Sequence, residues 1–243
     1  MALPLLVLAS AGRCRGRAHE SAVSLCNTLD ALHAKGTLAN ETLFVDVGAA
    51  RAYQTIVARW YGMRVLAFEC RFDEVARLRD TFKADPLVTL MPMCAGEEPG
   101  HATLNRAGDS SSLHKELVSH GVEAKKARRE AVRSEVVNIT TLDLQLTPER
   151  LRALNVKSVG FIKIDTQGHE GAVLAGAATT VQRDMPFLFY ENMFDRRGTP
   201  AWQRTGANYS CSCDKQDCMC CATSRCGAPP APPPGAAVRS MPG

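Results

Sequence analysis

The stretch FVDVGAARAY, residues 44–53, contains the features that decide the fold. Its apolar residues lead into Asp46, and Gly48 follows after one valine. A short continuous apolar run is typical of a strand buried on both faces of a parallel sheet. Gly48 allows a sharp turn and a close approach of the backbone to a ligand. The stretch is compatible with a cofactor-binding turn, and also with a buried strand that ends at a glycine.

The rest of the chain repeats an alternation of strand and helix. Strands are predicted at 42–48, 64–69, 87–96, 159–165 and 186–192, and helices at 20–36, 52–62, 72–85 and 169–183. Such alternation indicates an α/β fold whose parallel sheet carries helices on both faces.

The region 97–158 is less regular, and it is expected to shape the substrate pocket. A short strand is expected at 101–106, a helix at 113–133, and an extended segment at 135–144. Thr147 is expected to cap a further helix, because Pro148 and Glu149 follow it.

Three parts of the chain differ in composition. Residues 1–19 form an N-terminal extension, 20–226 a single domain, and 227–243 a Pro/Gly-rich tail that is expected to be disordered. The apolar run at 2–9 is too short to span a membrane. It could be the core of a signal peptide, but no basic residue precedes it. We therefore predict a cytoplasmic protein without a stable membrane span, with secretion or organelle import as the alternative.

The charge of the chain is nearly balanced. It has 243 residues, of which 29 are basic and 25 acidic, with a formal net charge of +4. This balance gives no support to nucleic-acid binding, and the basic run KKARRE at 125–130 is interpreted as a solvated helix face.

Six of the ten cysteines lie between residues 211 and 226, in and after a predicted hairpin at 208–221. Buried free thiols that act as small apolar residues are the preferred interpretation. Disulfides and a structural zinc site are the alternatives.

Acidic residues mark the ends of two neighbouring predicted strands. Asp46 ends the first, and Glu69, 23 positions later, ends the second. An acid at the tip of the second strand can accept two hydrogen bonds from a ribose diol. The fingerprint G-x-G-x-x-G is absent, since only Gly48 is present, so a dinucleotide site is disfavoured. The pattern suits an adenosine ligand with a cationic or amine-bearing end.

A third group of polar residues follows the strand at 159–165, in the block FIKIDTQGHE at 161–170. Asp165, Gly168, His169 and Glu170 meet at this strand tip, where they are poorly suited to a core and well suited to a site. His169 can act as a base near neutral pH. The alternative makes His169 a surface residue and Glu170 an acid of the first helical turn.

The segments FVDVGA, LAFE, IKIDTQGHE, VLAGA and YEN together resemble the FkbM family of S-adenosylmethionine-dependent methyltransferases, over roughly residues 40–195. The resemblance implies the Rossmann-like class I methyltransferase fold, a seven-stranded sheet whose last strand is antiparallel. The hairpin at 208–221 would supply strands six and seven.

The same resemblance assigns roles to individual residues. The cofactor S-adenosylmethionine would contact Asp46, Gly48, Ala49, Glu69, Cys94 and Ala95. Asp165 and His169 are the candidate bases, Glu170 would orient them on the acceptor side, and no metal is expected. Glu191 and Asn192 are further candidates for the acceptor pocket.

Two alanines depart from the pattern of the family. Ala50 stands where asparagine is usual, and Ala52 where glycine is usual, so an additional methyl group is expected close to the cofactor. We predict an O-methyltransferase that acts on a hydroxyl of a small molecule or glycan. A non-catalytic binding protein of the same fold and a Rossmann-type oxidoreductase are the alternatives.

Overall fold

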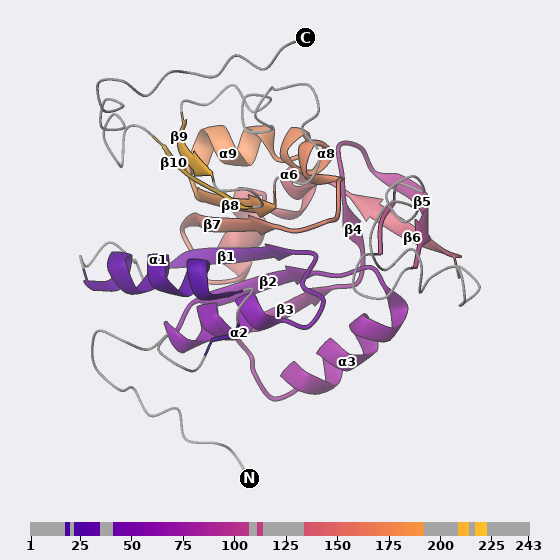
Figure 1. Cartoon of the computed structure of the whole chain (residues 1–243), viewed down its shortest axis with the longest axis horizontal. Helices are drawn as coiled ribbons and strands as arrows, with labels where there is room; N and C mark the ends of the chain where they lie inside the picture. Colours follow the sequence, from indigo (N-terminus) through magenta and orange to yellow (C-terminus); the bar gives the residue numbers. More distant parts are fainter. Residues whose placement is uncertain are drawn as a thin grey trace.

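A central sheet with helices on both faces dominates the molecule (Figure 1). The computed structural model describes residues 18–19, 22–34, 41–106, 111–113, 134–191, 209–213 and 217–222. The main sheet consists of β1 (Thr42–Val47), β2 (Arg64–Phe68), β3 (Val88–Met91), β7 (Ser158–Ile164), β8 (Phe187–Glu191), β9 (Tyr209–Cys213) and β10 (Asp217–Ala222). A second, smaller sheet consists of β4 (Cys94–Ala95), β5 (Gly100–Asn105) and β6 (Ser134–Thr140). The helices are α1 (Val23–Ala34), α2 (Tyr53–Trp60), α3 (Phe72–Phe82), α6 (Leu142–Gln145), α7 (Pro148–Ala153), α8 (Glu170–Ala175) and α9 (Ala178–Asp184).

The order of strands in the main sheet is β3-β2-β1-β7-β8-β10-β9. The first five of these strands are parallel, and β10 runs antiparallel to both of its neighbours. The chain order therefore reverses between β1 and β7, which is where ligands bind in open α/β sheets. This topology confirms the predicted class I methyltransferase fold, including the hairpin that supplies the last two strands.

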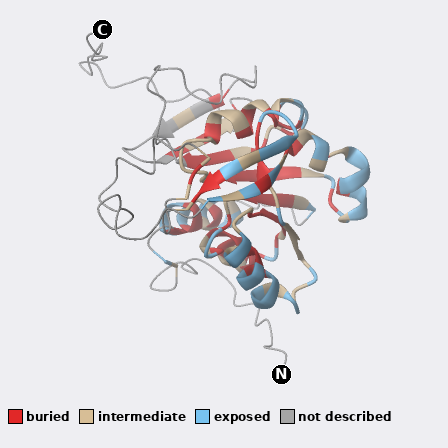
Figure 2. Ribbon diagram, turned by 90° about the vertical axis from the view of Figure 1, so that its right-hand side faces the viewer, coloured by how far each residue is buried: buried red, intermediate tan, exposed pale blue. Residues whose placement is uncertain are grey.

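Each face of the sheet has its own hydrophobic core. Leu43, Val45 and Val47 of β1 pack toward apolar residues of α6, α7, α8 and α9. Phe44 packs on the opposite face with residues of α1, α2 and α3, and its ring stacks against Phe161 of β7. The strands are therefore buried on both sides, as the continuous apolar runs predict, and Figure 2 shows the buried residues gathered in the central strands.

Two predicted elements are divided in the structure. The strand expected at 87–96 ends at Met91, and Cys94 begins β4 in the second sheet. The helix expected at 169–183 breaks at Gly176, where a Cβ atom would lie 2.0 Å from the carbonyl oxygen of Gly96. The two backbones pack closely at this break. The sequence did not predict it, because its helical periodicity continues through Gly176.

Helix starts in the region 134–153 depend on threonine caps. The extended segment expected at 135–144 ends at Thr140, because Thr141 caps α6 by accepting a hydrogen bond from the Leu144 N–H. The predicted cap Thr147 is confirmed, with its hydroxyl accepting from the Arg150 N–H at 3.4 Å. The helix expected at 113–133, apart from Leu113, and the tail at 227–243 lie outside the described residues.

The expectation of free thiols in the C-terminal hairpin is wrong. Cys211 of β9 and Cys220 of β10 form a disulfide, and they are direct partners in the strand register. Cys218 and Cys221 are disulfide-bonded too, while Cys226 lies outside the described residues. Among the described residues no cluster of three or more His, Cys, Asp or Glu side chains could hold a metal ion. None of the described helices has the length and apolar character to cross a membrane.

Candidate active site

A cavity of about 490 Å³ opens at the carboxyl ends of β1, β2 and β7. This volume lies within the range of roughly 300–1,000 Å³ that is usual for small-molecule sites. The residues of the predicted site that line it are Gly48, Ala49, Glu69, Cys94, Ala95, Asp165 and His169. Asp46 and Glu170 do not line it, but each contacts a residue of the lining, Lys163 for Asp46 and Thr166 for Glu170.

The turn after β1 requires glycine at position 48. Gly48 has a φ of +73°, and a Cβ atom there would lie 2.0 Å from the carbonyl oxygen of Asp165. The N–H groups of Gly48 and Ala49 both donate to the carbonyl oxygen of Phe68, at 3.0 Å each. The backbone of this turn is thus held between the ends of β2 and β7, and a side chain at position 48 would push them apart.

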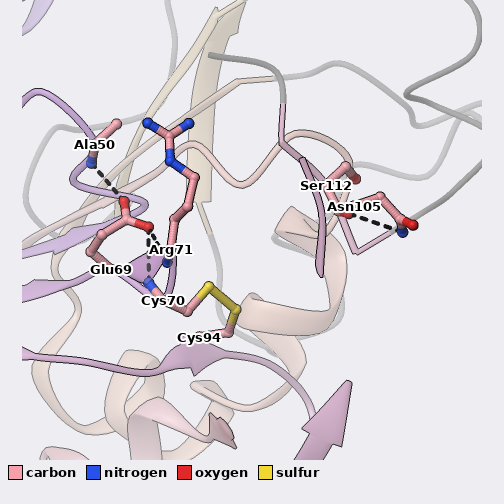
Figure 3. The surroundings of a disulfide bond; sticks show 7 residues. All are labelled: Ala50, Glu69, Cys70, Arg71, Cys94, Asn105 and Ser112. Carbon is pink, nitrogen blue, oxygen red and sulfur yellow. Dashed lines mark hydrogen bonds between the residues drawn. A yellow bond between two sulfur atoms is a disulfide. The ribbon is translucent and has the colours of Figure 1, made fainter. Parts of the chain in front are cut away.

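The carboxylate of Glu69 is held by three backbone N–H groups (Figure 3). Oε2 accepts from Ala50 at 2.8 Å, while Oε1 accepts from Cys70 at 2.9 Å and from Arg71 at 2.8 Å. Burial raises the pKa of Glu69, and these hydrogen bonds oppose that shift. Oε1 accepts two of these hydrogen bonds and Oε2 only one, so the second lone pair of Oε2 can still accept a hydrogen bond from a ligand in the cavity.

Asp46 takes part in a buried ion pair and does not contact the cavity. Its Oδ1 lies 3.1 Å from Nζ of Lys163, its partner in the register of β1 and β7, and Oδ2 accepts a 2.6 Å hydrogen bond from Thr55 of α2. Both charged residues are almost fully buried. The described interactions of Asp46 thus point into the protein, and its predicted contact with a cofactor stays a prediction.

Lys163 connects Asp46 to the cavity. Its Nζ donates to the carbonyl oxygen of Gly48 at 2.8 Å and lies 3.8 Å from Oδ2 of Asp165. Burial lowers the pKa of this ammonium, but the attraction of Asp46 and Asp165 outweighs it, so the net shift is upward. The residue stays charged, and it fixes the turn at Gly48 against the end of β7.

Asp165 and His169 stand on opposite sides of a tight turn. Oδ1 of Asp165 accepts from the side chain of Gln167 at 3.0 Å. Gln167 has a φ of +54° and Gly168 a φ of +99°, so the chain reverses here before α8 begins. The ring of His169 lies against Gly96, where a Cβ atom would come within 3.2 Å of Nε2. The predicted bases therefore share the cavity, one at the end of β7 and one at the start of α8.

Glu170 holds this turn together and does not face an acceptor. Oε1 accepts from the N–H and the hydroxyl of Thr166, at 2.9 and 3.0 Å, and both oxygens accept from the N–H of Gly168. Burial raises the pKa of Glu170. The carboxylate is therefore directed into its own turn, and its predicted orienting role on the acceptor side stays a prediction.

The two alanines that depart from the family pattern adopt left-handed backbone conformations. Ala50 has a φ of +39° and Ala52 a φ of +62°. Ala52 does not line the cavity, is 1% exposed, and packs in the core under α2. The expected crowding of the cofactor by an additional methyl group at position 52 is therefore not found, and the cost of both alanines is backbone strain.

Several lining residues were not predicted from the sequence. His19 stacks on Tyr53, the first residue of α2, with ring centroids 3.8 Å apart, so the assigned N-terminal extension contributes to the cavity wall. Arg71, two residues after Glu69, donates hydrogen bonds from its guanidinium to Asp73 and Glu74. The sequence did offer a signal for both: Tyr53 ends the stretch that contains the Gly48 turn, and Arg71 lies two residues after Glu69.

Comparison with solved structures gives distant likenesses. The crystal structure of methyltransferase FkbM from Methylobacillus flagellatus KT aligns with 14% identity and a TM-score of 0.48, covering 76% of this chain and 45% of that chain. Precorrin-6y C5,15-methyltransferase from Geobacter metallireducens GS-15 aligns with 11% identity and a TM-score of 0.43, covering 88% and 93%. The chain thus spans less than half the length of the first of these proteins. No curated protein matches it.

A family model gives the decisive match. The model of the methyltransferase FkbM domain matches residues 46–204, which is more than half of the chain. The matched segment begins at Asp46 and includes every predicted site residue. The chain therefore belongs to the FkbM methyltransferase family.

Proposed function

We propose that the chain is an S-adenosylmethionine-dependent O-methyltransferase that acts on a hydroxyl of a small molecule or glycan. The observation that carries the proposal is the shared cavity: the Gly48 turn, the Glu69 carboxylate and the pair Asp165 and His169 all line it. Methyl transfer to a hydroxyl needs a turn that binds the cofactor, a group that accepts hydrogen bonds from the cofactor's ribose, and a base, and these residues are candidates for all three.

The cavity fits the cofactor in volume and in chemistry. Glu69 would accept a hydrogen bond from a ribose hydroxyl through Oε2, and its anchored carboxylate needs no reorganisation to do so. Cys94 and Ala95 would lie along the adenine, and the Gly48 turn along the methionine part. The Lys163 ammonium is paired with Asp46, so it places no uncompensated positive charge beneath a sulfonium.

Bound S-adenosylmethionine supplies an electrophilic methyl group. The contribution of the protein is to place the acceptor oxygen in line with that group, at about 3–3.5 Å, and to remove its proton. Asp165 and His169 are the candidates for the base. Lys163 and Gln167 hold the carboxylate of Asp165, while Glu170 shapes the turn that carries His169.

The cysteines support an oxidising compartment, which favours the secreted or organellar alternative over a cytoplasmic location. Thiols in the cytosol are kept reduced. Seven cysteines are disulfide-bonded, namely Cys26, Cys70, Cys94, Cys211, Cys218, Cys220 and Cys221. Differential alkylation of the protein isolated from its own source, before and after reduction, tests this inference; free thiols at these positions would refute it.

Calorimetric titration with S-adenosylmethionine tests the cofactor, and absence of binding at millimolar concentration would refute the proposed function. Methyl-labelled cofactor, incubated with extracts rich in small molecules and glycans and analysed by mass spectrometry, identifies the acceptor. A protein that binds cofactor but labels nothing would support the non-catalytic alternative.

The base is tested with three variants once an acceptor is known. His169→Ala is expected to retain cofactor binding and to lower kcat about 100-fold or more, if His169 removes the proton. His101→Ala, an exposed histidine on β5, is the matched control and is expected to retain full activity. Unchanged kcat in His169→Ala would assign the base to Asp165, to be checked with Asp165→Asn.

A further inference from the structure

The Cys70–Cys94 disulfide joins the two sheets at the wall of the cavity. Cys70 directly follows Glu69 at the end of β2, whereas Cys94 begins β4 of the smaller sheet, and both residues line the cavity. Figure 3 shows the bond beside the Glu69 carboxylate, on the side away from Ala50. The bond therefore covalently connects the segment that carries Glu69, which we propose to bind the ribose, to β4.

The residue next to Glu69 is both a hydrogen-bond donor and an end of this bond. The Cys70 N–H donates to Oε1 of Glu69 at 2.9 Å, and the Arg71 N–H donates to the same oxygen. The direction of the carboxylate is thus set by the backbone of residues 70 and 71. Anything that moves this backbone turns the carboxylate relative to the cavity.

The disulfide is the covalent part of the contacts that hold β4 beside the end of β2. The backbone of β4 pairs with β6, in the smaller sheet. Near Cys94 a small buried cluster contains Cys94, Leu104 and Val137, with Cys70, Leu113 and Ile139 packed against it, while Ala95 of β4 packs in the larger core that also contains Phe68 of β2. The disulfide adds a covalent constraint to this packing, and it acts on the residue whose N–H donates to Glu69.

We propose that the Cys70–Cys94 disulfide is a positioning element of the cofactor site, so that cofactor affinity depends on the oxidation state of this bond. The inference rests on the proposed function, because it assumes that the cavity binds S-adenosylmethionine. Besides the proposed place of Cys94 along the adenine, the bond acts through Glu69 and through the spacing of the two sheets. They take no part in methyl transfer.

The redox step is a thiol–disulfide exchange with a dithiol as reductant. A thiolate of the dithiol attacks one sulfur of the Cys70–Cys94 bond, and a mixed disulfide forms as the other cysteine leaves as a thiolate. The second thiolate of the reductant then displaces the protein sulfur and closes its own disulfide. Two electrons pass from the dithiol to the protein, and the two cysteine thiolates take up the two protons that the dithiol has lost.

The chain contains its own control, because Cys211–Cys220 joins β9 to β10, and neither of these cysteines lines the cavity. Binding of S-adenosylhomocysteine is measured by calorimetry for the wild type, for Cys70→Ala/Cys94→Ala and for Cys211→Ala/Cys220→Ala, without reductant. The first double variant is expected to bind about tenfold or more weakly, the loss that follows when one hydrogen bond to a charged group is misplaced. The second is expected to stay within about twofold of the wild type, as a distant, independent site should.

A split between kinetic constants separates positioning from general stability. Cys70→Ala/Cys94→Ala is expected to raise KM for S-adenosylmethionine while kcat at saturation stays near the wild-type value. If that variant does not fold, dithiothreitol titration of the folded wild type replaces it. Affinity is then followed together with the appearance of free Cys70 and Cys94, which is mapped by mass spectrometry on parallel samples.

The outcomes are distinct. Equal affinity of the wild type and Cys70→Ala/Cys94→Ala, or unchanged affinity while both thiols are free, overturns the inference and leaves the proposed function intact. An equal loss in both double variants also overturns it, because that loss reports stability alone. Failure of the oxidised wild type to bind overturns the proposed function, and the inference with it.

Discussion

The backbone N–H of Ala50 donates a 2.8 Å hydrogen bond to Oε2 of Glu69, although the two residues follow different strands. The bond joins the turn after β1 to the acid at the end of β2. Ala50 adopts a left-handed conformation with a φ of +39° to make it. The geometry of the proposed ribose acceptor therefore depends on a strained alanine at a position where asparagine or glycine would adopt the same backbone at less cost.

Replacing Ala50 with glycine is expected to stabilise the protein. The left-handed conformation costs alanine about 1–2 kcal/mol, which glycine avoids. Glycine loses more conformational entropy on folding, which offsets part of this gain. We expect a net gain of about 0.5–1 kcal/mol, or a few degrees in Tm. Ala49→Gly is the control, since Ala49 is buried and has no positive φ, and it is expected to lower Tm. A lower Tm for Ala50→Gly would contradict the claim that the backbone of Ala50 is strained.

The buried pair of Lys163 and Asp46 is expected to tolerate the loss of both charges better than the loss of one. Lys163→Met leaves the Asp46 carboxylate buried without its counter-charge and is expected to cost about 3–5 kcal/mol in the free energy of unfolding. Lys163→Met/Asp46→Asn is expected to recover part of that loss. Denaturant titrations of the single and double variants measure the coupling, and strictly additive effects would contradict it.

An exposed ion pair gives the control for this cycle. Lys157 lies beside Glu41 at the surface, and both side chains are more than half exposed. Because solvent screens such a pair, Lys157→Met is expected to cost less than about 1 kcal/mol.

Gly48→Ala and Gly62→Ala separate backbone strain from steric overlap. Both glycines have nearly the same φ, +73° and +75°, but a Cβ atom at Gly62 has no neighbour within 4 Å. Gly62→Ala is expected to cost about 1 kcal/mol and to leave cofactor binding unchanged. Gly48→Ala must displace the Asp165 carbonyl, so we expect a loss of about 3 kcal/mol or more and no measurable binding. Similar stabilities of the two variants would contradict the close packing of β1 and β7.

Cofactor affinity is expected to fall in mild acid because of Glu69. Burial raises its pKa, so the carboxylate takes up a proton at a higher pH than an exposed glutamate does. The affinity that depends on the carboxylate is complete above this raised pKa and is lost as the pH falls through it. Titrations with S-adenosylhomocysteine from neutral pH into mild acid measure this loss.

The variant Glu69→Gln isolates the contribution of the acid. His19 and His169 also line the cavity, and both remain in the variant. The variant is expected to bind more weakly at every pH, because its amide N–H₂ would face the Ala50 N–H, and to show a flatter profile. A profile identical to that of the wild type would exclude Glu69 as the titrating group.

The positions of the strand ends could be predicted because they depend on local pattern. Continuous apolar runs marked the buried strands, and the acids and glycines that follow them marked the edge where the cavity lies. Whether a polar side chain there faces the ligand or the protein is a different question. Asp46 and Glu69 looked alike in the sequence, but a lysine in register on β7 draws Asp46 inward, while backbone N–H groups hold Glu69 at the cavity.

The sequence by itself determined the alternation of strands and helices, the family, and some of the residues that line the cavity, since each of these depends on periodicity and short motifs. Only the tertiary structure decided the pairing of Lys163 with Asp46, the inward direction of Glu170, and the disulfides Cys70–Cys94 and Cys211–Cys220. These contacts join residues that are distant in the chain or lie across a sheet. Their formation depends on the register and packing of whole elements, which no local pattern encodes.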